Sequence, residues 1–521
     1  MKKQGAFLIT AAIATVFSIV LVLSGTAVAE TCKESIATVV SVQGSVQVRL
    51  KGETEWKPVQ LNDVFCPGDM VRVRDRSRSA IVLSNETIIR LDEKTTITFS
   101  GVEKKETSLL DLLRGAVHFI SRFPRTLKIV TPFVNGTVEG TEFLVEVIED
   151  QSRITVFEGQ VLAVNDAGSL TLMTGQSAVA REGQAPAMRV VVRPRDAVQW
   201  ALYYPPILMH DSSGIKDVQE EVSDPRFFTS RASMLLAVGR VDEARKDIEK
   251  ALNLAPGYSD AIALQSIIAV VQNEKIEAMR LAQNAVEAGP DSLAARIALS
   301  YAQQANFDLD GALASLQEAV KLAPENSLAW ARLSELWASF GNLDKALDAA
   351  EKAVSLNPDL ARTQTVLGFS YLTQIKIDSA LNTFGKAIEL DQADPLPRLG
   401  LGLAKIRKGK LKEGRREIEI ATSLDPGQSI IRSYLGKAYY EEKRENLAMD
   451  QYGMAKELDP LDPTSFFYDA IQKQTLNRPV EALHDMQKAI ELNDNRAIYR
   501  SKLLLDEDLA ARSAGLARIY S

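Results

Sequence analysis

Four arginines at alternate positions form a run of positive charge near the N-terminus. They are Arg72, Arg74, Arg76 and Arg78, in the stretch VRVRDRSRS. Side chains two residues apart point to one face of a regular strand, so these guanidinium groups could together hold an anionic glycan or a phosphate. The alternative is a solvated strand whose charges discourage pairing at a sheet edge.

The two cysteines could form one disulfide. Cys32 and Cys66 would be able to pair in an oxidising compartment. Closing a loop of about 33 residues would stabilise the fold by roughly 3 to 4 kcal/mol. The alternative leaves both thiols unpaired.

The other reactive residue types are too sparse to predict catalysis. The three histidines, His118, His210 and His484, are scattered along the chain and do not indicate a metal cluster. The sequence contains no Walker-type glycine loop, no HExxH and no GxSxG, and no predicted helix follows the glycine-rich GTVEGTE. We therefore predict a protein that is not an enzyme, with no catalytic residues, no metal and no cofactor.

Length and composition indicate how many domains position these residues and of what kind they are. A chain of 521 residues predicts two or more domains. Apolar residues make up 46% of it and charged residues 25%, which is typical of globular domains. The formal net charge of −7 does not favour a nucleic-acid partner.

The N-terminus has the order of a secretory signal peptide. Two lysines precede an apolar run over residues 6–23, and the small-residue site Ala27-Val28-Ala29 follows. Residues 1–29 are therefore predicted to export the chain to the periplasm, the cell envelope or the outside of a bacterium. Because the apolar run approaches the length of a membrane span, an uncleaved anchor is the alternative, and only then would the protein contact a membrane.

Residues 30–195 alternate apolar and polar side chains in short runs, which predicts a β domain. VVSVQGSVQVRL, SAIVLSNETIIRL and QVLAVNDAGSLTLM each predict two strands around a turn. In TPFVNGTVEGTEFLVEV we expect Pro132 and Gly136 to interrupt the ladder and Gly140 to permit a sharp bend. The residues that follow and should point inward are Phe143, Val145 and Val147.

Five motifs in this region resemble, in their order, the periplasmic domain of FecR-type proteins. They are VSVQGSV, PGDMVRV, LLRGAVHFI, TPFVNGTVEGTEFLVEV and VFEGQVLAV, within about residues 36–165. In signalling members of the family this domain follows a cytoplasmic anti-sigma segment and a membrane helix, whereas five residues precede the apolar run in this sequence. The resemblance therefore implies docking to an envelope component such as a glycan, and a FecR-type sensor or regulator with altered output is the alternative.

After a predicted linker at residues 196–224, the sequence repeats with a period of 34 residues. Alanine stands five residues before each helix-ending position, and further small residues stand twelve and twenty-four residues before it. Small side chains at these places would let two antiparallel helices approach closely. The helix-ending positions are Pro256, Pro290, Pro324, Pro358, Gln392, Pro426, Pro460 and Asp494.

The unit WARLSELWASFGNLDKALDAAEKAVSLNP, from Trp330, resembles a tetratricopeptide repeat. Eight such units would cover residues 225–496 and stack into a superhelix, lined inside by the first helix of each pair. An insertion and an incomplete ninth repeat are predicted for residues 497–521. The predicted fold is therefore multidomain, with an all-β FecR-like domain followed by an all-α tetratricopeptide solenoid.

The geometry of that repeat family places eight apolar or aromatic residues in a groove on the inner surface. Cations for a partner's terminal carboxylate are largely absent there, so an extended peptide or an amphipathic helix of a protein partner is the favoured ligand. In the alternative, these side chains are buried between adjacent repeats or against other segments of the chain. They are Ile297, Tyr301, Phe369, Leu372, Leu399, Leu403, Ile406 and Tyr440.

These patterns together predict an exported, non-catalytic protein–protein interaction scaffold of the cell envelope. Its FecR-like domain would dock to an envelope component, and its groove would bind a protein partner.

Overall fold

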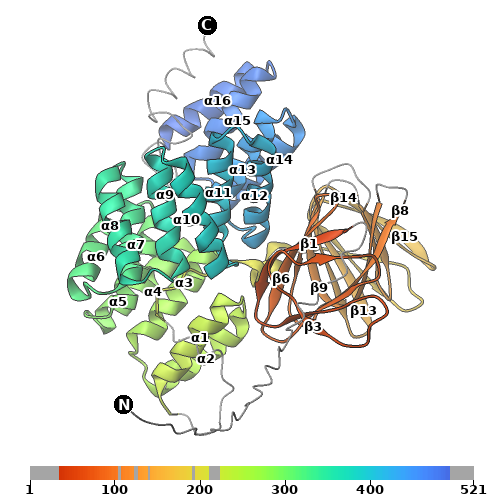
Figure 1. Cartoon of the computed structure of the whole chain (residues 1–521), viewed down its shortest axis with the longest axis horizontal. Helices are drawn as coiled ribbons and strands as arrows, with labels where there is room; N and C mark the ends of the chain where they lie inside the picture. Colours follow the sequence, from red (N-terminus) through yellow and green to blue (C-terminus); the bar gives the residue numbers. More distant parts are fainter. Residues whose placement is uncertain are drawn as a thin grey trace, which may run out of the picture. The chain divides into compact units, whose positions relative to one another are not determined.

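The computed structural model describes residues 35–103, 107–121, 127–138, 141–190, 194–209 and 223–492 (Figure 1). Strands lie between residues 37 and 190, and α-helices follow from residue 225. This order confirms the predicted all-β domain followed by an all-α solenoid. The predicted signal peptide, Cys32, Gly140, His210 and the predicted insertion and ninth repeat at 497–521 lie outside the described residues.

Two sheets make up the β domain and share the long strand β9 (Thr107–Ile120). Residues 107–114 of β9 pair in the second sheet and residues 115–120 in the first, because Gly115 turns the strand at a φ of +95°. The order of the first sheet is β4 (Val64–Phe65), β1 (Ala37–Gln43), β6 (Arg78–Leu83), β7 (Ile88–Leu91), β9, β12 (Glu142–Ile148), β13 (Gln151–Glu158), β16 (Gln176–Arg181) and β17 (Ala187–Val190). The order of the second is β3 (Lys57–Pro58), β2 (Val46–Arg49), β5 (Met70–Val73), β8 (Thr96–Glu103), β9, β10 (Leu127–Val130), β11 (Asn135–Val138), β14 (Gln160–Asn165) and β15 (Gly168–Met173).

The core of the β domain lies between the two sheets. Alternate residues of the strands point into it, as the period-two pattern predicts. The Phe119 and Phe143 rings stack there with their centroids 4.7 Å apart, and Val145 is fully buried beside them. The opposite face of β12 is also buried, since Glu142 and Leu144 are 2% and 0% exposed. One strand of the first sheet therefore has burial on both sides.

The stretch around Pro132 differs in one respect from the expected ladder. Pro132 lies in the turn between β10 and β11, as expected, but Gly136 lies within β11 and pairs with Ile129 and Ala163. The expectation that Gly136 breaks the ladder is wrong. A Cβ at this position would lie 3.6 Å from Cδ1 of Ile154, in ordinary contact, and the φ of Gly136 is not among the positive values.

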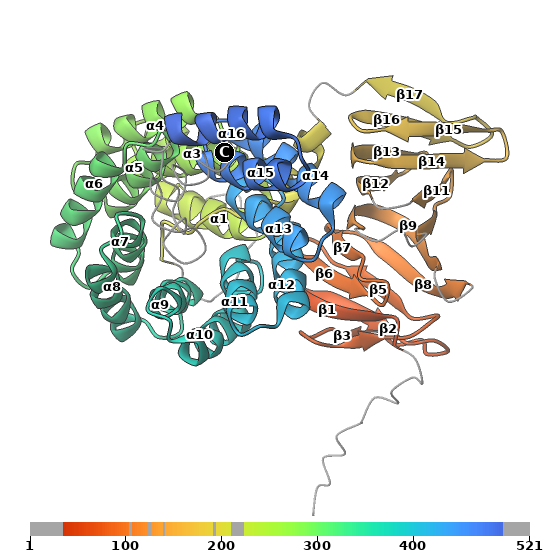
Figure 2. The ribbon, with the colours of Figure 1, turned by 90° about the horizontal axis from the view of Figure 1, so that it is seen from above.

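Sixteen α-helices in the described residues form eight antiparallel pairs, and a 3₁₀ helix, η1 (Pro194–Ala201), precedes them. Figure 2 shows the pairs following one another in a curved array. The pairs are α1 (Pro225–Ala237) with α2 (Val241–Leu254), α3 (Ser259–Val271) with α4 (Lys275–Ala288), α5 (Leu293–Ala305) with α6 (Leu309–Leu322), α7 (Ser327–Ser339) with α8 (Leu343–Leu356), α9 (Ala361–Thr373) with α10 (Ile377–Leu390), α11 (Pro395–Arg407) with α12 (Leu411–Leu424), α13 (Ser429–Glu441) with α14 (Glu445–Leu458), and α15 (Pro463–Thr475) with α16 (Pro479–Glu491).

The turn inside each pair uses one residue in the left-handed region, where φ is positive. Glycine takes this conformation without steric cost, yet five of the eight positions carry another residue. The turns are short and identical in spacing, which fixes where each second helix begins. The positions, 34 residues apart, are Gly239, Asn273, Phe307, Gly341, Ile375, Gly409, Lys443 and Asn477.

Small residues lie where the helices cross. Gly402 of α11 faces Gly414 of α12, and a Cβ on Gly402 would lie 2.7 Å from the carbonyl oxygen of Gly414. Gly400 leaves room for the ring of Phe384, because a Cβ would lie 2.2 Å from its Cζ. The small positions of the 34-residue period therefore act through close helix packing, as predicted.

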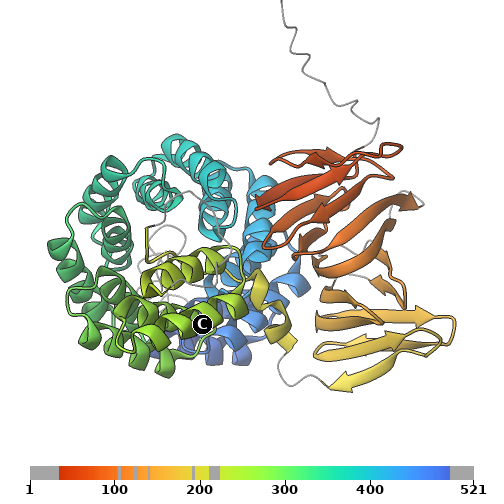
Figure 3. The ribbon, with the colours of Figure 1, turned by 90° about the horizontal axis from the view of Figure 1, so that it is seen from below.

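The helix array closes on itself after one superhelical turn. Nδ2 of Asn273, in the α3–α4 turn, donates a hydrogen bond to the carbonyl oxygen of Leu458 at 2.8 Å. Lys275 forms an ion pair with Asp459 at 3.0 Å, in the α14–α15 turn. The second and seventh pairs are thus in direct contact across the array (Figure 3).

Candidate peptide-binding site

The first helices of the pairs surround a cavity of about 280 Å³ inside the array. Val271 of α3, Tyr301 of α5, Arg332 of α7, Arg362 of α9 and Ile430 of α13 all line it. These residues lie on different repeats, and the closed superhelical turn brings them together. The cavity is therefore a property of the array rather than of one repeat.

A segment of the chain itself lies inside the array and forms part of the wall of this cavity. Residues 202–209 follow η1, contain no helix or strand, and contribute Tyr203 and Pro205 to the cavity wall. We call residues 202–209 the connecting segment. Its Leu202, Tyr204 and Ile207 are 9%, 3% and 2% exposed, in one hydrophobic cluster with the first helices.

Contacts at its two ends fix the connecting segment. At the start, Cδ2 of Leu202 approaches Gly427, where a Cβ would lie only 2.9 Å away. Asp425 accepts a hydrogen bond from the backbone N–H of Tyr203, so the α12–α13 turn holds this end. At the other end, the sulfur of Met209 lies 4.0 Å from Oγ of Ser327, at the start of α7.

The β domain also contacts the start of the connecting segment. Nη1 of Arg78, on β6, donates hydrogen bonds to the carbonyl oxygens of Trp200 at 2.7 Å and Leu202 at 3.1 Å. Nη2 of Arg78 donates to the carbonyl oxygen of Ala237 at 3.0 Å. Burial and the nearby Arg240 lower the pKa of Arg78 to about 10. Arg78 therefore joins three parts of the chain through its fork of donors.

A chain of polar contacts crosses the cavity wall from α5 to α9. Arg332 lies over the ring of Tyr301 at 3.8 Å and donates to Glu335 at 2.9 Å. Glu335 also forms an ion pair with Arg362 at 2.5 Å, and Nη2 of Arg362 donates to Oη of Tyr301 at 3.2 Å. The charges of the wall are thus paired with one another across three repeats.

Two carboxyl groups at the connecting segment are buried. Burial raises the pKa of Asp394 to about 7 although Arg362 opposes the shift, and Oδ2 of Asp394 has no hydrogen-bond partner. Burial raises the pKa of Asp425 to about 6, opposed by hydrogen bonds from Gln428, Gly427 and Tyr203. Burial therefore makes both groups harder to ionise than an exposed carboxyl group.

Arg90 of β7 is buried next to these groups without a partner. It is 0% exposed, and in the described residues none of its three guanidinium nitrogens has a hydrogen-bond partner. Its pKa is held well below its usual value, first by burial and then by Arg78, while Asp425 and Asp391 oppose the shift. Burying a charge without a partner is costly, so the buried guanidinium group of Arg90 is poorly satisfied.

The eight predicted groove residues do not lie together in the cavity. Tyr301 lines it, and Ile406 and Tyr440 are half-buried, with Oη of Tyr440 lying 3.0 Å from Oγ1 of Thr475. The other five pack in the hydrophobic cluster of the array and are at most 4% exposed, because they fill the space between first and second helices. They are Ile297, Phe369, Leu372, Leu399 and Leu403. Peptide binding by these eight side chains stays a prediction.

The four alternate arginines do not share one face, so the expected regular strand is wrong. The strand β5 ends at Val73, and Arg76 has a φ of +52°, because the chain turns here before β6. Arg72 lies over the ring of Trp56 at 4.0 Å, Arg74 is exposed and Arg76 pairs with Glu243 at 3.1 Å. Arg78 lies buried at the connecting segment. Anion binding by this run is not tested by the contacts.

The cysteine and histidine predictions have the following outcomes. Cys66 is disulfide-bonded, but Cys32 lies outside the described residues, so their pairing stays a prediction. His118 is buried, with Nε2 3.3 Å from Oε1 of Glu142, whereas His484 is exposed on α16. Within the described ranges no group of three or more His, Cys, Asp or Glu could hold a metal ion.

None of the helices in the described parts of the chain is long and apolar enough to cross a membrane.

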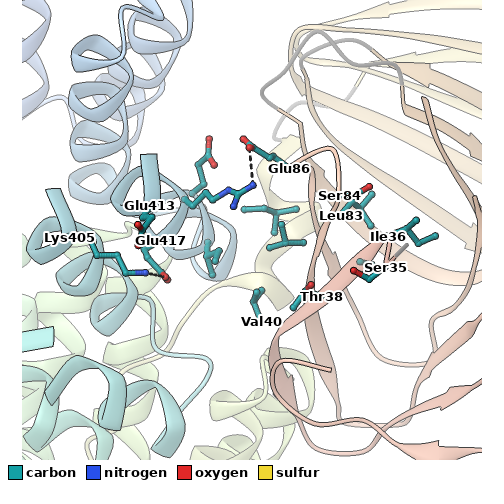
Figure 4. Close-up of a pocket in the computed structure, with 16 residues that line it drawn as sticks. Ser35, Ile36, Thr38, Val40, Leu83, Ser84, Glu86, Lys405, Glu413 and Glu417 are labelled. Atoms are coloured by element: carbon teal, nitrogen blue, oxygen red, sulfur yellow. Dashed lines mark hydrogen bonds and ion pairs between the residues drawn. The ribbon is translucent and has the colours of Figure 1, made fainter. Parts of the chain in front are cut away.

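The β domain and the solenoid share an apolar contact. Ile420 and Leu424 of α12 pack in one buried cluster with Val40, Ala80 and Ile88 of the first sheet. Beside this cluster lies a second cavity of about 440 Å³, between β1, β6 and β7 on one side and α11 and α12 on the other (Figure 4). The part of the first sheet formed by β1, β6 and β7 is therefore covered on its outer face by the solenoid.

Charged groups extend this contact at both sides of the apolar cluster. Arg432 of α13 donates two hydrogen bonds to the carboxylate of Glu142, at 2.8 and 3.0 Å, and both residues are almost fully buried. The carboxylate of Glu86 accepts from Arg415 at 3.2 Å and from Arg416 at 2.9 Å at the rim of the second cavity. We call the apolar cluster, Glu142, Arg432 and these rim residues the domain contact.

Sequence reasoning missed the connecting segment and the residues that hold it. The sequence predicts only a linker over residues 196–224, although two tyrosines and a leucine at residues 202–204 are unusual in a solvated linker. This aromatic content was the available signal. Asp394, Asp425 and Arg90 carry no such signal, because each lies in a repeat or strand where a solvated charge is equally consistent with the pattern.

Comparison with known proteins agrees with the two parts of the fold. Residues 69–162 match the family model described as FecR protein. Tetratricopeptide repeat models match residues 225–258, 303–368 and 399–463. A search of curated proteins finds no match.

Solved structures resemble the chain at low identity. A chain of the APC/C hetero-tetramer Cut9-Hcn1 is 18% identical with a TM-score of 0.46, over 57% of this chain and 56% of that one. A tetratricopeptide repeat protein from Parabacteroides merdae ATCC 43184 is 17% identical with a TM-score of 0.36, over 51% of this chain and 100% of that one. YrrB, described as a TPR protein with an unusual peptide-binding site, is 20% identical with a TM-score of 0.25, over 34% of this chain and 91% of that one. Together with the matches to the family models, the fold identifies this chain as a FecR domain followed by tetratricopeptide repeats.

Proposed function

We propose that the protein is an exported, non-catalytic interaction scaffold of the bacterial cell envelope, whose solenoid binds an extended segment of a partner protein in the cavity of the array. The observation that supports this most is that the inside of the array already packs against a segment of the chain's own backbone without helix or strand, beside the remaining cavity. Peptide recognition by a groove needs apolar pockets for anchors and polar groups that fix orientation. The cavity offers both.

The wall residues support this function chemically. The Tyr301 ring and Ile430 provide apolar surface, while Arg332, Glu335 and Arg362 provide donors and acceptors fixed in place by one another. Side chains that are locked by neighbours lose little entropy when a ligand binds. FecR and tetratricopeptide domains are typically non-catalytic, which is consistent with an interaction role.

The FecR domain is proposed to dock to an envelope component through a surface other than its first sheet. The outer face of that sheet is covered by α12 through Ile420 and Leu424. Arg74 remains exposed on the loop after β5 and belongs to the surface that is left. Export rests on the N-terminal sequence pattern, and N-terminal sequencing of the chain from the periplasmic fraction tests it. A chain that still begins at Met1 in the inner membrane would instead favour the FecR-type sensor.

Site-specific photo-crosslinking tests the partner-binding function. Phe307 lines the cavity, so a benzoylphenylalanine there keeps an aromatic ring at the wall. The matched control is the half-buried Phe340 at the end of α7, which is not among the cavity-lining residues. We expect crosslinks from the Phe307 position to one segment of a defined envelope protein and none from Phe340. Equal crosslinking from both positions would contradict binding in the cavity.

A further inference from the structure

The sequence of the connecting segment identifies the chemistry of the partner. We propose that the partner presents an aromatic–proline–aliphatic segment, and that it binds by taking the place of residues 202–209 in the cavity. This inference rests on the proposed function, because it assumes that a partner enters the same cavity. The segment of the chain reads LYYPPILM.

The contacts of the connecting segment show which features the cavity recognises. Leu202, Tyr204 and Ile207 fill apolar positions among the first helices, and the hydroxyl of Tyr203 donates to Asp391 at 3.5 Å. Pro205 and Pro206 favour extended backbone in the residues before them. A proline-rich segment also loses less entropy on binding, because its backbone is already restricted. An aromatic pair followed by two prolines and aliphatic residues therefore matches the cavity.

The connecting segment lacks the hydrogen-bond ladder of a helix or strand, which makes it replaceable. Polar contacts reach it from Arg78, Asp425 and Asp391. Near Asp425, the buried Arg90 has no hydrogen-bond partner among the described residues. The segment is thus held by apolar contacts and a few hydrogen bonds.

A binding measurement on the full-length mature protein tests this inference. The probe is a fluorescent peptide with the sequence of residues 200–209, WALYYPPILM, and a scrambled peptide of the same composition serves as the control. The double variant Tyr203→Ser/Tyr204→Ser weakens the internal segment and leaves the cavity wall intact. We expect it to bind the probe at least tenfold more tightly than the wild type, and at least tenfold more tightly than the scrambled peptide.

Two further variants locate the binding. Gly427→Leu places a side chain where Leu202 lies, so it should abolish probe binding when added to the double variant. Phe340→Ala changes an aromatic residue that is not among the cavity-lining residues and should leave probe binding unchanged. Circular dichroism of each variant shows whether the helices are retained. If Gly427→Leu does not fold, the comparison of probe binding between the double variant and the wild type still tests the inference.

Three outcomes would overturn the inference. In the first, the probe binds equally well to the wild type and the double variant. In the second, the probe and its scrambled form bind equally well. In the third, the double variant self-associates and addition of the probe dissociates these oligomers. The last result would identify a second copy of the chain as the occupant. If Phe307 crosslinks to a partner while the probe does not bind, the function stands and only the partner's chemistry is wrong; absence of crosslinks from Phe307 sinks the function itself.

Discussion

The domain contact and the connecting segment are both buried, but they treat charge in opposite ways. At the domain contact, Glu142 receives two hydrogen bonds from Arg432. Near Asp425, which holds the connecting segment, Arg90 is equally buried and has no hydrogen-bond partner among the described residues. The first arrangement is strongly destabilised when one partner is removed, whereas the second already carries the cost of an unpaired charge.

This difference separates a permanent contact from an exchangeable one. The domain contact combines an apolar cluster on α12 with a satisfied ion pair, so it should persist until the whole unit unfolds. The connecting segment combines apolar side chains with few hydrogen bonds and contains no helix or strand, so it should open locally at a lower free energy. The solenoid would then be fixed to the FecR domain while its cavity stays open to exchange.

The largest expected effect comes from breaking the satisfied pair. Arg432→Ala removes the two hydrogen bonds that the buried Glu142 carboxylate accepts from Arg432, and should lower the free energy of unfolding by about 3–5 kcal/mol. Urea denaturation followed by circular dichroism measures this change. The matched control, Arg416→Ala, removes an arginine whose side chain is 55% exposed and pairs with Glu86, and should cost less than about 1 kcal/mol. Similar costs for the two variants would show that the buried pair is not special.

The next largest effect concerns the connecting segment alone. Tyr203→Ala removes a ring that is 7% exposed, and should lower the free energy of local opening by roughly 2 kcal/mol. Proteolysis between residues 202 and 209 should become faster, while the urea midpoint of the remaining fold changes little. An equal loss of stability in the whole solenoid would mean that the segment is a structural part of the core.

The free energy of closing the connecting segment should depend on pH. The pKa values of Asp394 and Asp425 are raised to about 7 and about 6 where the segment covers them. Closed states with raised carboxyl pKa values bind more protons than open states, so closure is favoured at low pH and weakens as pH rises from about 4 to 7. The loss is at most about 1.4 kcal/mol per pH unit for each group.

Amide exchange of the segment between pH 5 and 8, corrected for intrinsic rates, measures this weakening. Asp394→Asn keeps an N-cap at the start of α11 and should remove the part of the dependence near pH 7. A segment whose protection increases with pH would reverse the sign and contradict the assignment.

The smallest expected effect on stability is that of replacing Arg90, and the same replacement at Arg432 serves as the comparison. Arg90→Met replaces an unpaired buried charge by an apolar side chain of similar length, and should change the free energy of unfolding by less than about 1 kcal/mol or stabilise the protein. Arg432→Met should be destabilising, because the buried Glu142 carboxylate loses two charge-assisted hydrogen bonds. Thermal melts of the two variants are the measurement, and a strong loss from Arg90→Met would show that Arg90 has a partner in solution.

The sequence was sufficient to predict elements whose residues interact locally. The 34-residue period follows from small residues such as Gly402 and Gly414, which meet within one helix pair. The strands follow from alternation such as that of Phe143 and Val145. In both cases each short stretch carries its own packing signal, so one sequence is enough.

The site could be predicted only in part, because its contacts join residues far apart in the chain. Arg432 and Glu142 are 290 residues apart, and neither has a local feature that distinguishes it from a solvated charge. Phe369 and Leu403 have the apolar character of groove residues and of core residues alike, and the structure places them in the core. Arg78 follows the same pattern as Arg74, yet the turn at Arg76 places Arg78 inside and leaves Arg74 exposed.

Hydrogen exchange of the full-length protein tests the central distinction most directly. The amides of Leu202, Tyr203, Tyr204 and Ile207 should exchange through local opening, at a free energy well below that of strand β12 and with little dependence on low urea concentrations. The amides of β12 and α13 should exchange together, at the highest free energy in the protein. If the connecting segment exchanges at the same free energy as β12, it is a permanent part of the core and the account of an exchangeable occupant is wrong.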